Sequence, residues 1–226
     1  IYEGTYKYED FDKVGDTYTL KRNVPYFSSE SNTQPGMPKY ADLNGDGIID
    51  DNDRTMIGNG MPKHTGGFTN NFEYKGFDLS IFFQWSYGND VLNANRLFFE
   101  NSNKTRDLNQ YASYADRWTP ENPESNIPRA TDSGSNKVFS TRIIEDGSFL
   151  RLKTVSLGYT LPKQLTKKWK IDNARVFVAG QNLWTCTGYS GYDPEVSIRE
   201  GALTPGLDFS AYPRAYSISF GINLGF

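Results

Sequence analysis

The sequence predicts an all-β fold: a segment of about five antiparallel strands of a transmembrane β-barrel, with long extracellular loops. Stretches of about eleven residues alternate between apolar and polar or small residues, and a tilted strand of that length crosses a bilayer. The chain is 15% aromatic although its mean hydropathy is −0.64, which is typical of strands with one apolar and one polar face. The connections between the predicted strands are short at one end and long at the other.

The strand predicted over 77–87 has the clearest alternation. Every odd-numbered position from Phe77 to Tyr87 is apolar or aromatic, whereas most positions between them are polar. The stretch 66–74 alternates in the same way, and the dipeptide 75–76 (Lys-Gly) between the two predicts a tight hairpin turn. We expect one face of this hairpin to contact lipid, through Phe77, Leu79, Ile81, Phe83 and Trp85.

The last strand, predicted over 214–226, has large apolar residues on one face and only small or neutral polar residues on the other. A soluble β-sandwich would carry charge on its wet face, whereas an enclosed lumen tolerates small neutral residues, so this strand favours a barrel. We expect its apolar face to contact lipid through Ile218, Phe220, Ile222 and Leu224.

Two further strands are predicted over 148–161 and 174–184. In the first, the apolar residues have even numbers up to Leu152 and odd numbers from Val155 onward. This switch near residues 153–154 predicts a β-bulge. The alternative is that the charged part of the strand stands above the membrane.

The links between strands predict the orientation of the chain in a bacterial outer membrane. The links 75–76 and 162–173 are short, whereas 88–147 and 185–213 are long and polar. Barrels of this membrane have short periplasmic turns and longer outside loops, so we expect extracellular loops and a periplasmic C-terminus. Aromatic residues mark both ends of the strands, as they do in the girdles that flank the apolar band of a barrel.

An acidic loop at 42–53 is the sharpest chemical motif. It lies in residues 1–65, which we expect to form an extracellular loop region before the C-terminal barrel strands and loops of 66–226. Calcium prefers hard oxygen ligands, and an EF-hand-type loop supplies them from positions 1, 3, 5, 7, 9 and 12, with Gly at position 6. Asp at the last position replaces the usual Glu, and the alternative is a turn rich in Asp and Asn that binds no metal. The predicted ligands of a structural calcium ion are Asp42, Asn44, Asp46, the backbone carbonyl of Ile48, Asp50 and Asp53.

Other kinds of site have little support in the sequence. His64 is the only histidine and Cys186 the only cysteine, which excludes a metal site built on several histidines, a cysteine metal site and an internal disulfide. The net charge of −3, without a cluster of Lys and Arg, argues against nucleic acid as a partner. We therefore predict no enzymatic activity. The chain opens with Ile-Tyr-Glu-Gly, without Met or a signal peptide, so we expect it to be a piece of a longer protein.

A series of motifs follows in order from about Pro38 to Phe226. They are 40–58 (YADLNGDGIIDDNDRTMIG), 62–68 (PKHTGGF), 74–79 (YKGFDL), 148–153 (SFLRLK), 157–162 (LGYTLP), 180–183 (GQNL) and 189–195 (YSGYDPE). In these motifs the chain closely resembles the C-terminal part of the SusC/RagA family of TonB-dependent outer-membrane transporters of Bacteroidetes.

The resemblance implies a barrel of roughly 22 strands, occluded by an N-terminal plug and capped by a SusD-like surface lipoprotein. Family members import oligosaccharides or peptides with energy relayed by TonB, which contacts an N-terminal part that this chain lacks. About five strands cannot close a barrel, so the remainder of the barrel must supply the others. The terminal Phe226 resembles the signal by which the outer-membrane assembly machinery recognises barrels.

The leading functional prediction is therefore the barrel wall and extracellular loops of a TonB-dependent importer. The alternative is a soluble calcium-binding, β-rich surface module that binds glycan through aromatic residues of its loops, and a secreted β-rich enzyme comes third. Loop residues that we predict to contact the substrate or the lid are Trp118, Tyr189, Tyr192 and Asp193.

Overall fold

The computed structural model describes residues 1–101, 109–131, 138–195, 197 and 204–226. The chain divides into two compact units, each built from separate stretches of sequence. This grouping differs from the predicted division after residue 65, because much of the long connection 88–147 packs with the N-terminal residues. The strand unit comprises Gly60–Val91, Asp146–Gly206 and Ala211–Phe226, and the loop unit comprises Ile1–Asn59, Leu92–Glu145 and Leu207–Ser210.

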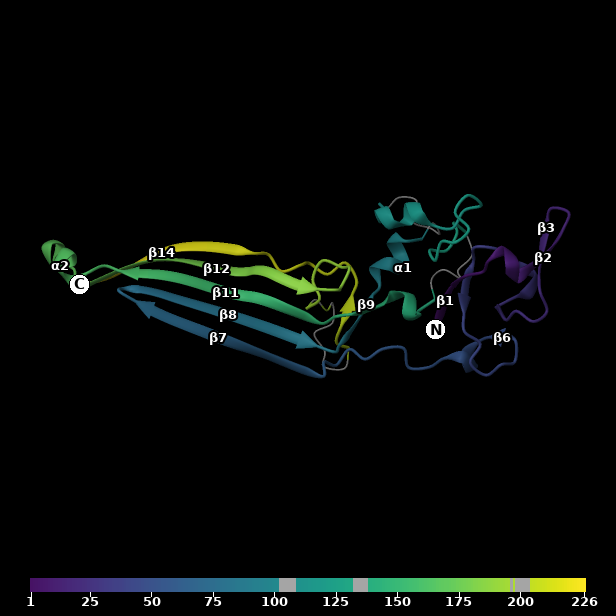
Figure 1. Cartoon of the computed structure of the whole chain (residues 1–226), viewed down its shortest axis with the longest axis horizontal. Coiled ribbons are helices and arrows are strands. Elements are labelled where there is room, and N and C mark those ends of the chain that lie inside the picture. Colours follow the sequence, from purple (N-terminus) through teal and green to yellow (C-terminus); the bar gives the residue numbers. More distant parts are fainter. Residues whose placement is uncertain (102–108, 132–137, 196, 198–203) are drawn as a thin grey trace. The chain divides into compact units, whose positions relative to one another are not determined.

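Long strands in the strand unit form one antiparallel sheet in the order β14-β12-β11-β8-β7 (Figure 1). Each long strand after β7 pairs with the long strand that precedes it in the sequence, as in the wall of an up-and-down barrel. The predicted all-β, antiparallel fold is confirmed. The strands are β7 (His64–Tyr74), β8 (Phe77–Tyr87), β11 (Phe149–Thr160), β12 (Asn173–Thr187) and β14 (Ser217–Gly225).

The bulge predicted in β11 is present. Between Leu152 and Thr154 the strand advances two residues while β8 advances one, from Phe83 to Phe82, so Lys153 is the extra residue. An extra residue cancels the change in parity of the apolar positions. All the large apolar residues of β11 after Phe149 therefore lie on the same face of the sheet.

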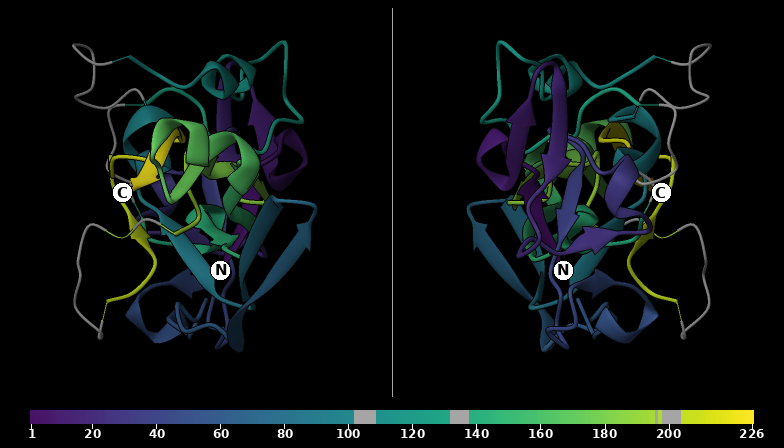
Figure 2. Two further views of the ribbon diagram at one scale, coloured as in Figure 1. Left: turned by 90° about the vertical axis from the view of Figure 1, so that its left-hand side faces the viewer. Right: turned by 90° about the vertical axis from the view of Figure 1, so that its right-hand side faces the viewer.

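The sheet has two chemically different faces and two different ends. The apolar face carries the odd-numbered positions of β8 and their partners, and the polar face carries the even-numbered positions. The turn end has the 75–76 turn, helix α2 (Lys163–Thr166) and the C-terminus, and the loop end is opposite (Figure 1). Views along the strands place the β7–β8 hairpin and β14 at opposite sides of the sheet (Figure 2).

The loop unit consists of short strands around a small aromatic core. Tyr6, Phe11 and Leu20 are buried there, because the β2–β3 hairpin folds its apolar residues onto the segment after β1. The β4–β6 pair is parallel, whereas the β1–β5 pair is antiparallel. The strands are β1 (Tyr2–Thr5), β2 (Phe11–Val14), β3 (Thr17–Leu20), β4 (Tyr26–Phe27), β5 (Pro38–Tyr40) and β6 (Ile48–Ile49).

The remaining regular elements are short. Strands β9 (Asp90–Asn93), β10 (Ile144–Asp146) and β13 (Leu207–Asp208) form a small sheet in the order β10-β9-β13, and helix α1 (Asn95–Phe99) follows β9. Within the described ranges, no helix has both the length and the apolar character needed to cross a membrane. Single 3-10 turns occupy Tyr8–Asp10, Glu30–Asn32, Asp51–Asp53, Ala112–Asp116, Thr141–Ile143 and Lys167–Trp169.

Candidate functional site

The apolar face of the sheet carries the residues predicted to contact lipid. Leu79 pairs with Leu157, Leu157 with Val178 and Val178 with Phe220, so the apolar positions of β8 and β14 share this face. Phe220 is 82% exposed and Ile222 67% exposed. Leaving such side chains in water forgoes about 1.5–3 kcal/mol for each, which a hydrocarbon environment would recover. Their contact with lipid stays a prediction.

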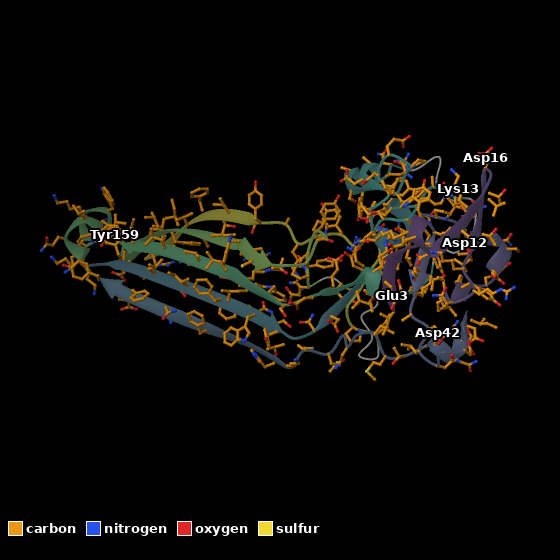
Figure 3. The ribbon with its side chains drawn as sticks, turned by 45° about the vertical axis from the view of Figure 1, so that its right-hand side comes forward. Glu3, Asp12, Lys13, Asp16, Asp42 and Tyr159 are labelled. Carbon is orange, nitrogen blue, oxygen red and sulfur yellow. The ribbon has the colours of Figure 1, made fainter. Side chains whose placement is uncertain are left out.

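Aromatic residues gather at both ends of this face. At the turn end, the rings of Phe77 and Tyr159 lie 4.5 Å apart, and Tyr159 marks that end in Figure 3. At the loop end, Trp85 Nε1 donates to His64 Nδ1 at 3.1 Å, and His64 stacks on Tyr87. The only histidine is therefore a member of an aromatic row.

The polar face has an ion pair near the turn end that crosses a strand. Arg175 Nε on β12 donates to Asp78 Oδ1 on β8 at 2.8 Å. Gly158 of β11 lies between them, and a Cβ there would overlap both the guanidinium and the carboxylate. A glycine is therefore required for the two side chains to meet over the intervening strand.

A second charged group, the Arg151 cluster, lies near the loop end of the polar face. Arg151 is only 2% exposed, and its guanidinium donates to Thr185 Oγ1 at 3.0 Å, to Asp193 Oδ1 at 2.5 Å and to Glu195 Oε2 at 2.9 Å. Asp193 also accepts from the backbone N–H of Arg214 at 3.2 Å, and the Arg214 guanidinium lies 3.2 Å from Glu195. These bonds hold the loop after β12 and the segment before β14 against β11.

The four loop residues predicted to contact a substrate or lid lie in different surroundings. Trp118, Tyr189 and Asp193 are buried within their own units, and Asp193 belongs to the Arg151 cluster. Tyr192 is 82% exposed. Contact of these residues with a substrate or a lid stays a prediction, and of the four only Tyr192 presents its side chain to solvent.

The acidic loop 42–53 is held together by its own backbone. Asp53 Oδ1 accepts from the N–H groups of Leu43 at 2.7 Å and Asn44 at 3.3 Å, and Asp53 Oδ2 accepts from Asp50 N–H at 2.8 Å. The Asp42 carboxylate accepts from the N–H groups three and five residues later, at 2.7 and 2.8 Å. The loop therefore closes through carboxylate–amide bonds between neighbours in the sequence.

These bonds lower the pKa of Asp53, and they involve the same carboxylates that are predicted to bind calcium. The Asp50 N–H, followed by those of Leu43 and Asn44, lowers the pKa of Asp53 against the opposing effect of its burial. As the side chains lie, no group of three or more His, Cys, Asp or Glu in the described part of the chain is arranged to hold a metal ion. Calcium binding at this loop stays a prediction.

Phe226, the predicted assembly signal, follows β14 at the turn end and is 86% exposed. Nothing in the described chain covers its side chain, as a recognition signal requires. Its role in assembly stays a prediction.

Sequence reasoning missed both ion pairs of the polar face. The sequence predicts Asp193 only as a loop residue that contacts the substrate or the lid, and it indicates only a charged part of the strand over 148–161. A buried arginine inside a membrane-length strand requires a carboxylate partner, and that was the available signal. The partner could not be named because it lies 42 residues away in an irregular loop.

The curated proteins to which this chain is similar in sequence are TonB-dependent receptors. The chain is 36% identical over 201 residues to TonB-dependent receptor P3 of Formosa agariphila, covering 86% of this chain and 19% of that protein. It is 39% identical over 197 residues to receptor P26 of the same organism, covering 84% and 20%. It is 28% identical over 198 residues to TonB-dependent receptor SusC of Bacteroides thetaiotaomicron, covering 87% and 18%.

Solved structures give a consistent result. The RagAB peptide importer in the "closed-closed" state matches with a TM-score of 0.69 and 31% identity, over 84% of this chain and 21% of that chain. The "open-open" state matches with a TM-score of 0.67 and 29% identity, over 100% of this chain and 22% of that chain. No family model matches the chain. The chain spans about a fifth of the length of the relatives it matches.

Proposed function

Because this chain belongs to the SusC/RagA family of TonB-dependent receptors, we propose that it forms barrel wall and extracellular loops of an outer-membrane importer. The observation that carries the proposal is the sheet itself. Its membrane-length strands expose a continuous apolar face and a face of mostly small or polar residues, which is the pattern of a barrel wall between lipid and lumen.

The open edges of the sheet support the need for a larger barrel. In the described chain, β7 and β14 each pair with a long strand on one side only. Unpaired backbone groups in hydrocarbon cost several kcal/mol each. We therefore assign further strands of the same barrel to both edges.

The partners and cargo follow from the relatives. The solved relatives are RagAB assemblies described as a peptide importer, so we propose a SusD-like surface lipoprotein as the partner and oligosaccharides or peptides as the cargo. TonB and a plug would act through parts of the protein outside this chain. A soluble glycan-binding module is disfavoured, because it would leave the apolar face of β14 in water.

Cysteine labelling in intact cells tests the orientation. Asp16 lies at the tip of the exposed β2–β3 hairpin (Figure 3), and Lys168 lies in the link at the turn end. In the full-length protein with Cys186→Ser, a membrane-impermeant maleimide should label Asp16→Cys in intact cells and Lys168→Cys only after lysis. Labelling of Lys168→Cys alone in intact cells would reverse the orientation, and recovery of the protein in the soluble fraction would refute the barrel.

A further inference from the structure

A cavity of about 360 Å³ lies at the loop end of the polar face, wholly within the strand unit. Its floor is a row across neighbouring strands, in which Thr65 of β7 pairs with Ser86 of β8, and Ser86 pairs with Phe149 of β11. Gln84 lies one row further along β8 on the same face. The segment with Pro194 and Glu195 and the segment 205–206 form the opposite wall.

The Arg151 cluster holds this opposite wall in place. Arg151 binds Asp193 and Glu195 on either side of Pro194, and Gln84 Nε2 donates to Glu195 at 3.4 Å, which joins this wall directly to β8. On the other side, Gly60 lies so close to the Pro205 carbonyl oxygen that a Cβ there would be 2.7 Å from it. These contacts therefore fix the positions of the segments that form the cavity.

The charges around the cavity favour a neutral ligand. Among the described residues that line it, Glu195 is the only charged one, and this carboxylate contacts Arg151 at 2.9 Å, Arg214 at 3.2 Å and Lys153 at 3.7 Å. Its charge is thus already balanced by the chain. A cationic ligand would compete with these side chains for the Glu195 carboxylate, and the same carboxylate would repel an anionic ligand.

The lining also distinguishes between two kinds of neutral ligand. Sugar rings bind through hydroxyl groups and through stacking on an open aromatic face. Two aromatic residues line the cavity, Phe149 and Trp85. Phe149 is buried with the Arg151 guanidinium over its ring at 5.2 Å, and the side chain of Trp85 lies on the apolar face of the sheet, where it donates to His64. The cavity instead offers side-chain hydroxyl and amide groups beside proline rings, which match the N–H and C=O groups and small side chains of an extended peptide. The proline and hydroxyl or amide residues are Pro62, Pro194, Pro205, Thr65, Gln84, Ser86, Asn89 and Ser197.

We propose that this cavity is a subsite for an uncharged stretch of peptide, which it binds through the hydroxyl groups of Thr65 and Ser86 and through Gln84. The inference rests on the proposed function, because it assigns the cavity to cargo of the importer. The proline rings on the opposite wall would contact its side chains, and the Arg151 cluster would keep that wall in place.

The test uses the full-length transporter purified with its lipoprotein from native outer membranes. Binding of a library of uncharged peptides and of a library of neutral dextran oligosaccharides is measured by native mass spectrometry. The variant is Thr65→Val with Ser86→Ala, which removes two hydroxyl groups, one of which donates to Asn89 Oδ1 at 2.8 Å, and changes the size of the side chains little. The matched control is Thr69→Val with Ser80→Ala, which makes the same changes on the same strands and the same face outside the cavity.

We expect the wild type to retain peptides, the variant to bind them about tenfold more weakly, and the control to bind like the wild type. Equal peptide binding by variant and control would overturn the subsite. Oligosaccharide binding that only the variant weakens would assign the cavity to glycan and overturn the peptide proposal. Peptide uptake by wild-type cells, compared with cells that lack the transporter, tests import separately. Import by the wild type together with unchanged peptide binding by the variant refutes only the subsite, whereas no import by the wild type refutes the proposed function.

Discussion

Two carboxylate-rich loops of this chain are held by opposite means. In the 42–53 loop, Asp42 and Asp53 accept from backbone N–H groups no more than ten residues away. In the Arg151 cluster, Asp193 and Glu195 bind an arginine that lies 42 and 44 residues away on a strand. The first loop closes on itself, whereas the second depends on the sheet, so the two should respond differently to the same kinds of perturbation.

Removing the arginine should give the largest effect. Arg151→Met leaves Asp193 buried without its cation, and loss of one partner of a buried pair costs about 3–5 kcal/mol. We expect rapid amide exchange in the loop after β12 and the segment before β14 of the full-length protein, with no change in the 42–53 loop. Lys153→Met is the control, because Lys153 lies 3.7 Å from Glu195 and is more exposed. Equal effects of the two substitutions would contradict a special role for Arg151.

Calcium should affect only the other loop. If calcium binds at 42–53 as predicted, a concentration of a hundred times its dissociation constant stabilises the loop by about 2.7 kcal/mol. We expect slower amide exchange there in calcium than in a chelator, and no difference in the Arg151 cluster. Asp46→Asn should weaken this response. Identical exchange with calcium and chelator, at millimolar calcium, would show that carboxylate–amide bonds alone close the loop.

A glycine substitution tests how far the 42–53 loop depends on backbone shape. Gly47 has φ +86°, and a Cβ there would contact nothing within 4 Å. Gly47→Ala should therefore cost only the strain of the left-handed conformation, about 1–2 kcal/mol. Gly188→Ala is the matched control, because Gly188 has equal space but no positive φ. Proteolysis rates of the folded protein would measure the loss of stability in both variants. A similar loss in Gly47→Ala and Gly188→Ala would show that the left-handed conformation of Gly47 is not the cause.

Acid should produce the smallest effect. The lowered pKa of Asp53 means that its bonds contribute stability above the ordinary aspartate pKa of about 4, and that this contribution is lost as the pH falls through the lower pKa of the folded loop. Amide exchange at Leu43, Asn44 and Asp50, corrected for its intrinsic pH dependence, should therefore rise only in strong acid. Asp53→Asn should remove this acid-dependent step. A step that persists in Asp53→Asn would assign it to another carboxyl group.

The strands could be predicted because their signals are local. Alternation over 77–87, the tight turn at 75–76 and the parity switch near 153–154 each depend on neighbours in the sequence, and the structure has the hairpin and the bulge. A second irregularity escaped prediction. Between Gln181 and Trp184, β12 advances three residues while β11 advances two, and Asn182 has φ +51°. Apolar and polar residues alternate poorly in β12, so the sequence does not show where the alternation shifts by one residue.

The amino-acid sequence by itself determined which residues of β8 and of β14 share a face, because alternation follows from the geometry of consecutive residues in a strand. Only the tertiary structure decided that Arg175 reaches Asp78 over Gly158, and that Arg151 meets Asp193. The physical reason is that a charge finds its partner through strand register and the path of a loop. Neither the register nor the path of the loop can be inferred from the residues next to the charge in the sequence.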